Sequence, residues 1–159
     1  MKALTLTQPY ATLVAIGAKR IETRSWATSY RGPLAIHAGA GLGPVGERRA
    51  FARLCRTRPF EQALGAADLP NYDLYPEGMP FGAVVALVRL VGICRITNAG
   101  IEGFQPQPAA NEIAFGDYTP GRYAWLLADV RPLAEPIPAK GALGLWEWEP
   151  QERAAAPSE

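Results

Sequence analysis

The sequence is poor in the residues that build metal centres and disulfide frameworks. It has two cysteines, Cys55 and Cys94, and a single histidine, His37, among 159 residues. So few ligands cannot assemble a zinc quartet or a disulfide scaffold, and a ribonuclease mechanism that needs two histidines is excluded as well. We therefore expect no metal site, no cofactor, and two buried thiols in a cytoplasmic protein.

Long hydrophobic runs are also lacking. No apolar stretch reaches the roughly 20 residues that cross a bilayer, and the N-terminal MKALTLTQPY has no apolar core of a signal peptide. The sequence thus predicts no membrane association. A chain with 48% hydrophobic and 19% charged residues is globular in composition. Its length predicts one domain over 1–149 and a disordered tail over 150–159.

Acidic residues are scarce in the first part of the chain. Residues 1–58 hold ten basic and two acidic residues, whereas residues 59–159 hold six basic and thirteen acidic residues. A basic segment of this kind is typical of a surface that binds polyanions. Alternatively, the two parts could neutralise each other once folded.

Hydrophobic periodicity predicts several short strands and few helices. Strands are expected at Ala3–Thr7, Arg20–Trp26, Leu34–His37, Gly82–Thr97 with a bulge at Gly92, Tyr123–Val130 and Leu145–Trp148. Helices are expected from Pro9 to Gly17 and from Pro44 to Pro59, whereas 60–82, 98–121 and the proline-rich 132–138 look irregular. We expect an α+β fold, a small β-barrel with helices packed around it, and an insertion at about 40–82.

The second predicted helix has two distinct faces. Phe51, Leu54 and Cys55 share one side at helical spacing, and Arg49, Arg53 and Arg56 share the opposite side. Such a basic stripe is either a solvated surface or a track for a nucleic-acid backbone.

The segment from Gly17 to Trp26 carries the most chemistry. On an extended strand Glu22, Arg24 and Trp26 point to one side, and Lys19 lies where that strand begins. A guanidinium can hold a phosphate or a base edge, a carboxylate can accept from an exocyclic amine, and an indole can stack on a base. The alternative is a solvated ladder of ion pairs beside a half-buried tryptophan.

The same residues resemble a known family. Gly17, Lys19, Glu22 and Arg24 match G-x-K-x-x-E-x-R, and here the chain is similar to the ASCH domain family, in particular its bacterial members. The preceding L-x-L-x-Q-P-Y-A-x-L-V, the following R-S-W-x(3)-Y-R-G-P-L-x-I-H-A, and the segments G-R-Y-A-W-L-L-x-D-V and K-G-x-L-G-L-W add to the resemblance. It implies a PUA-like barrel whose motif lines a cleft and binds RNA, single-stranded nucleic acid or a nucleotide.

The resemblance also implies an enzymatic alternative. Some small members of the family are amidohydrolases of acetylcytidine that use a lysine base, a threonine nucleophile and a downstream glutamate, and others have been proposed as ribonucleases. Lys19 keeps the place of the lysine, but Glu22 stands where the nucleophile would be, and a carboxylate replaces that hydroxyl poorly. Glu22 could instead activate a water beside Lys19. Lys19 and Glu22 are therefore the candidate catalytic residues of a metal-independent hydrolase acting on RNA or a modified nucleoside.

The complete set of candidate ligand-binding residues surrounds this motif: Gln8, Lys19, Glu22, Arg24, Trp26, Tyr30, Arg31 and His37. Gln8 could read a base or cap a helix. Tyr30 and Arg31 could contact a phosphate or form an ordinary turn. His37 could be half of an acid–base pair or a hydrogen-bonded histidine of the barrel wall. A third alternative is a protein-interaction surface that uses Tyr72, Tyr75 and Phe81.

Overall fold

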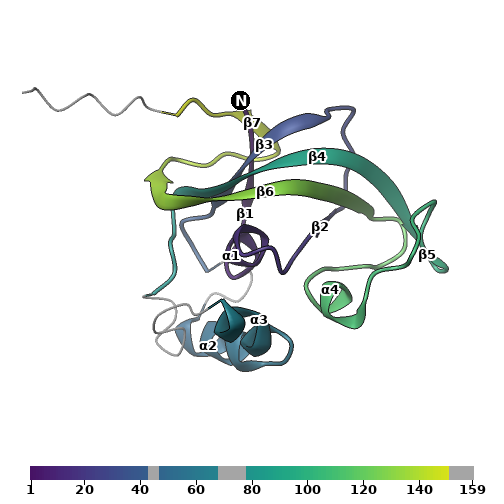
Figure 1. The fold of residues 1–159 in the computed structure, drawn as a ribbon, viewed down its shortest axis with the longest axis horizontal. Coiled ribbons are helices and arrows are strands. Elements are labelled where there is room, and N and C mark those ends of the chain that lie inside the picture. Colours follow the sequence, from purple (N-terminus) through teal and green to yellow (C-terminus); the bar gives the residue numbers. More distant parts are fainter. Residues whose placement is uncertain (43–46, 68–77, 151–159) are drawn as a thin grey trace, which may run out of the picture.

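A curved mixed sheet organises the computed structural model, which describes residues 1–42, 47–67 and 78–150 (Figure 1). The strands are β1 (Lys2–Leu6), β2 (Ile21–Arg24), β3 (Gly32–Ala38), β4 (Ala83–Thr97), β5 (Gly100–Ile101), β6 (Tyr123–Pro138) and β7 (Leu145–Glu147). They lie in the order β2-β6-β4-β3-β1-β7, and β5 pairs with the end of β4. β1 and β3 run parallel, while the other neighbours are antiparallel. The sheet forms a half-barrel, which confirms the predicted α+β, PUA-like class.

The two longest strands, β4 and β6, form the main wall of the half-barrel. Along β4, Val88 and Leu90 are buried while their neighbours face outward, because successive side chains alternate across a strand. The register between β4 and β6 shifts at three places, including one between Leu90 and Gly92. The bulge predicted at Gly92 is therefore confirmed, and these irregularities accompany the curvature of the sheet.

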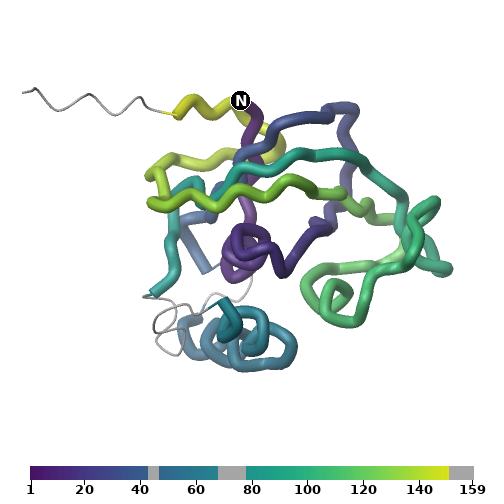
Figure 2. Tube along the Cα trace, viewed as in Figure 1, coloured from purple at the N-terminus to yellow at the C-terminus, as the bar shows by residue number. Residues whose placement is uncertain are grey.

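Within the described residues, four short helices pack around the half-barrel: α1 (Tyr10–Ala15), α2 (Arg48–Arg56), α3 (Phe60–Ala66) and α4 (Ala110–Ala114). Helix α1 places Val14 in the main core of the sheet. Helices α2 and α3 lie next to each other beyond α1 (Figure 2). They share a second apolar cluster, which contains Phe51, Leu64, Leu13 of α1 and Phe115. None of the described helices is long and apolar enough to span a bilayer.

Some sequence-based expectations about these elements are wrong. Residues 60–82 are not irregular throughout, because α3 begins directly after Pro59, and its Phe60 and Leu64 enter the second cluster. Likewise 98–121 contains β5 and α4. The proposed start at Pro44 lies outside the described residues, as do Tyr72, Tyr75 and the tail from 151. Helix α2 has Glu47 as its N-cap residue.

The sequence suggested that the prolines at 132–138 would interrupt the strand that begins at Tyr123. They do not interrupt it. The strand continues to Pro138, and it pairs with β4 from Tyr123 to Pro132 and again at Ile137 and Pro138, with an irregularity between the two stretches. On its other side, β2 reaches only from Tyr123 to Leu126. The second half of β6 is therefore an edge, where a proline without an N–H group is tolerated.

Candidate ligand-binding site

A cavity of about 470 Å³ lies where the two ends of the sheet approach each other. Strand β7 pairs with β1 only over Lys2–Leu4, so the following residues of β1 face the end strand β2 across a seam. The residues that line this seam cavity are Thr5, Leu6, Thr7, Tyr10, Glu22, Thr23, Arg24, Ser25, Trp26, Phe115, Gly116, Asp117 and Arg122. Its volume lies within the range of small-molecule sites.

The turn after α1 directs Lys19 into the protein. Gly17 has a φ of 80°, a left-handed conformation that favours glycine, and the main-chain N–H groups of Ala18 and Lys19 both donate to the carbonyl of Leu13. The chain therefore reverses tightly, and the Lys19 side chain becomes fully buried. This local geometry explains the glycine two residues before the lysine in the motif.

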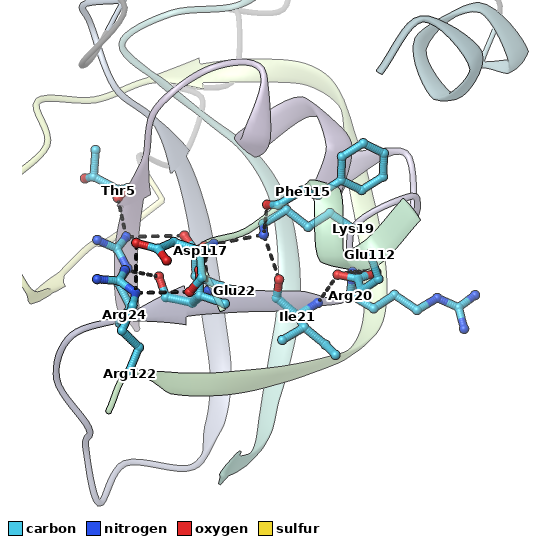
Figure 3. A network of polar contacts seen from close by, with 11 residues as sticks. Thr5, Lys19, Arg20, Ile21, Glu22, Arg24, Glu112, Phe115, Asp117 and Arg122 are labelled. Atoms are coloured by element: carbon cyan, nitrogen blue, oxygen red, sulfur yellow. Dashed lines mark hydrogen bonds and ion pairs between the residues drawn. The ribbon is translucent and has the colours of Figure 1, made fainter. Parts of the chain in front are cut away.

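The Lys19 ammonium links β2 to the segment that follows α4 (Figure 3). Its Nζ donates to the carbonyl oxygens of Ile21 at 2.7 Å and Phe115 at 2.6 Å, and lies 3.5 Å from Glu22 Oε1. Burial lowers the pKa of Lys19, while the Glu22 carboxylate acts in the opposite direction. With three acceptors around an ammonium that has three N–H groups, Lys19 positions other residues and does not itself line the cavity.

Glu22 and Arg24 stand side by side on β2 and both face the seam cavity. Glu22 Oε1 accepts from the main-chain N–H of Thr23 at 2.9 Å, and Glu22 Oε2 lies 3.6 Å from Arg24 Nη2. The same Nη2 donates across the seam to the carbonyl of Thr5 at 2.8 Å. Arg24 Nε is buried and has no hydrogen-bond partner in the described part of the chain. The guanidinium therefore keeps donor capacity that the fold does not use.

The opposite wall comes from the segment between α4 and β6. The main-chain N–H of Asp117 donates to Thr23 Oγ1 at 2.9 Å, and Arg122 Nη2 donates to the carbonyl of Thr23 at 3.3 Å. Gly116 permits this approach, because a Cβ at that position would lie 3.1 Å from Thr23 Oγ1. The hydroxyl and N–H of Thr119 lower the pKa of Asp117, and Arg122 adds to the effect.

Aromatic rings complete the cavity. Trp26 meets Trp125 edge to face, with ring centroids 4.7 Å apart, and Trp125 Nε1 donates to the carbonyl of Trp26 at 3.2 Å. Tyr10 lies 5.7 Å from Lys19 Nζ, measured to the ring centroid, and burial raises its pKa. Both Tyr10 and Trp26 line the cavity, so a flat ligand has ring surfaces to stack against.

Sequence reasoning missed Glu112, which fixes the start of β2 from α4. Its carboxylate accepts from the main-chain N–H of Arg20 at 3.1 Å and of Ile21 at 2.9 Å (Figure 3). Sequence reasoning also missed Asp117 and Arg122. Like Glu112, these residues lie about ninety positions from the motif in sequence, so nothing local links them to it. A local signal for these two residues is that Asp117 and Arg122 carry opposite charges on either side of the turn that precedes the predicted strand from Tyr123.

Three of the other candidates are engaged elsewhere and are not among the residues that line the seam cavity. Gln8 Oε1 accepts from the N–H of Thr12 at 3.0 Å and so caps α1. The Tyr30 hydroxyl donates to the carbonyl of Pro33, and Arg31 donates to the carbonyl of Tyr30, so these two side chains stabilise their own turn. The seam cavity therefore unites Glu22, Arg24 and Trp26 but not Gln8, Tyr30 or Arg31.

His37 lies in a different place, in the wall formed by β3. It is 1% exposed, and its Nε2 donates to the carbonyl of Ala139 at 2.8 Å. That bond leaves Nδ1 to accept from Thr5 Oγ1, 3.1 Å away. His37 lines a second cavity of about 390 Å³ with residues 139–143. Across the described ranges, no three His, Cys, Asp or Glu side chains group as metal ligands.

The half-barrel and its seam cavity define a small α+β domain of the PUA-like class. Within that class the chain belongs to the ASCH domain family, whose family model matches residues 4–137. It is also similar to Activating signal cointegrator 1 of Mus musculus, with 40% identity over 85 residues, which are 51% of this chain. The matched part is 13% of the mouse protein, so the chain spans a small fraction of that relative.

Proposed function

We propose that this ASCH domain binds RNA, or a nucleotide derived from it, in the seam cavity. The observation that carries the proposal is the state of Arg24, which lines the cavity with a buried Nε–H that has no partner among the described residues. A buried donor left unsatisfied costs about 1–3 kcal/mol. A phosphate oxygen or a base carbonyl is the acceptor that a guanidinium pairs with best.

The other lining groups suit the remaining parts of a nucleotide. Trp26 and Tyr10 offer ring surfaces for stacking. Glu22 Oε2 has Arg24 Nη2 at 3.6 Å, beyond ordinary hydrogen-bond length, and so can accept from an exocyclic amine of a base. Arg122, on the opposite wall, adds a second guanidinium within the same cavity. We therefore expect recognition of one base together with its phosphate.

The shape of the site favours single-stranded RNA over a duplex. A base can enter a cavity of about 470 Å³ between β1 and β2 only if it is unstacked from its neighbours. Sequence-specific RNA recognition generally uses such splayed bases in loops and single strands. The contacts of Lys19 support binding more than the hydrolase alternative. Its Nζ is held by Ile21, Phe115 and Glu22, and Lys19 is not among the residues that line the cavity, where a substrate would lie.

Calorimetric titration with the four ribonucleoside monophosphates tests the proposal. Arg24→Gln should weaken binding by about tenfold or more, since a bidentate charge-assisted contact is lost. Arg131→Gln removes the same charge from an exposed position on β6, outside the cavity lining, and should leave affinity unchanged. Absence of binding by any nucleotide or single-stranded RNA would refute the proposal. Turnover of acetylcytidine that is lost in Glu22→Gln, while the variant unfolds at the wild-type temperature, would favour the hydrolase instead.

A further inference from the structure

Helix α2 carries a concentration of positive charge outside the seam cavity. Five arginines and one glutamate lie between residues 47 and 58. Two of these arginines, Arg49 and Arg53, are exposed on the helix, and we call them the α2 arginine face; Arg58, also exposed, lies two residues beyond the helix. On the other side of the helix Phe51 and Cys55 are fully buried in the second apolar cluster. At 100° per residue, Arg49 and Arg53 point away from that cluster.

The stability of the helix does not account for Arg49. It lies in the first turn, which contains no acidic residue, and the helix dipole disfavours a cation there. Arg53 lies one turn further on, so the two guanidinium groups repel each other. Arg53 itself lies in the last turn, where a cation suits the dipole. The positive charge of Arg49 is therefore unfavourable both to the helix dipole and to Arg53. A bound polyanion would neutralise this charge and remove the unfavourable interaction.

The seam cavity and α2 belong to one continuous packed unit. Tyr10 and Phe115 line the cavity, and both meet Phe60 of α3, with ring centroids 6.0 Å and 5.0 Å away. Helix α3 packs in turn against α2 through the second apolar cluster. Helices are about 10–12 Å in diameter, so a strand that passes over α2 and α3 to the cavity would cover a distance of roughly two helix diameters. Barrels of the OB fold cover about 4–16 nucleotides of single strand, and a strand of that length would reach across two helices.

We propose that the α2 arginine face holds the phosphates of a single-stranded RNA that places one nucleotide in the seam cavity. This inference rests on the proposed function and extends it from a nucleotide pocket to a path for a strand. The cavity would supply base selection, and the arginine face would supply affinity that depends on strand length and salt but not on sequence. An anionic membrane or an acidic protein could use the same charges, but neither would connect the face to a nucleotide cavity.

The test compares a nucleoside monophosphate with a single-stranded RNA of about 16 nucleotides, using the full chain. The double variant R49Q/R53Q should lose about tenfold in affinity for the long RNA at low salt and keep the wild-type affinity for the monophosphate. The slope of log K against log salt should become shallower by about 1.4, or about 0.7 for each phosphate contact. The control R95Q/R131Q removes two exposed arginines from β4 and β6 and should leave both affinities unchanged.

Three results would overturn the inference. The first is a long-RNA affinity and salt slope equal to those of the wild type. The second is an equal loss of affinity for the monophosphate, which would mean that the variant disturbs the cavity. The third is binding to phosphatidylserine vesicles that depends on the same arginines without any effect on RNA. If long RNA binds through these arginines while no monophosphate binds, the proposal that the seam cavity binds a nucleotide is refuted. Phosphate binding by the α2 arginine face would then be supported on its own.

Stability provides an independent readout of Arg49. Because the dipole and Arg53 both oppose its charge, R49Q should unfold at the same temperature as the wild type or a higher one, while it binds long RNA more weakly. A lower unfolding temperature would show that Arg49 stabilises the fold, and would contradict the argument that singles it out.

Discussion

Arg24 and Thr5 join the two ends of the half-barrel through a side chain, because Arg24 Nη2 donates to the main-chain carbonyl of Thr5 at 2.8 Å. Thr5 belongs to β1 and Arg24 ends β2, and these strands occupy nearly opposite ends of the sheet order. The seam is therefore spanned by a guanidinium that also faces a cavity. Because Arg24 both bonds across the seam and lines the cavity, substitutions of Arg24 test the stability of the fold and the proposed binding together.

Arg24→Lys should separate these two roles. An ammonium can still donate to the Thr5 carbonyl, but it lacks the planar fork that would hold a ligand at the same time. We expect nucleotide affinity to fall by about tenfold and the free energy of unfolding to fall by about 1 kcal/mol or less. Calorimetry and urea denaturation measure the two quantities. Unchanged affinity would show that the guanidinium does not contact the ligand.

Lys19→Met should destabilise the protein strongly. The substitution leaves the carbonyls of Ile21 and Phe115 and the Glu22 carboxylate without their buried cation. Removal of one partner from such a buried set typically costs about 3–5 kcal/mol. Urea denaturation measures the loss, and exposed Lys140→Met serves as the control, with an expected change below about 0.5 kcal/mol. A loss under 1 kcal/mol would contradict the positioning role.

Glu112→Ala should loosen the beginning of β2. The main-chain N–H groups of Arg20 and Ile21 then lose their carboxylate acceptor. We expect a loss of about 1–2 kcal/mol in unfolding free energy and faster hydrogen exchange at these two amides. Glu102→Ala, at an exposed position after β5, is the matched control. Unaltered exchange at both amides would count against the role of Glu112.

Thr119→Val should raise the pKa of the Asp117 carboxyl toward its ordinary value of 3.8, because the hydroxyl of Thr119 is the largest cause of its lowering. A carboxyl whose pKa is lower in the folded state contributes stability above pH 3.8, and this contribution is lost as the pH falls through the folded pKa. The variant should therefore show a weaker pH dependence of stability below about pH 4. NMR titration of the Asp117 side chain measures the pKa, and an unchanged value would refute the assignment.

Local sequence patterns account for the parts of the fold that depend on near neighbours. The long apolar run within Gly82–Thr97 located β4, and the end of the first helix at Gly17 was correctly placed. A short motif can encode such features because strand alternation and turn geometry act over a few residues. Glu22 and Arg24 both line the seam cavity, but so do Thr23 and Ser25, which strand alternation alone would put on the other side.

The remaining features depend on contacts between distant segments. Nothing near Glu112 or Asp117 indicates that they meet β2, because these contacts arise only when α4 and β6 pack against it. The prolines at 132–138 indicated a break in the strand, but they are tolerated because β2 pairs only with Tyr123–Leu126 and leaves the rest of β6 at an edge. Lys19 was expected to face a ligand, and its burial follows from the carbonyl of Phe115, which lies 96 positions away in the chain.

One wall of the seam cavity comes from residues 5–26 and the other from residues 115–122. During synthesis the seam cavity would therefore stay incomplete until residues 115–122 had been made, and β2 would lack its described partner strand until β6 emerged. Two separately produced fragments, divided within 102–109, would each carry only one wall of the seam cavity, and only their reassociation would rebuild it.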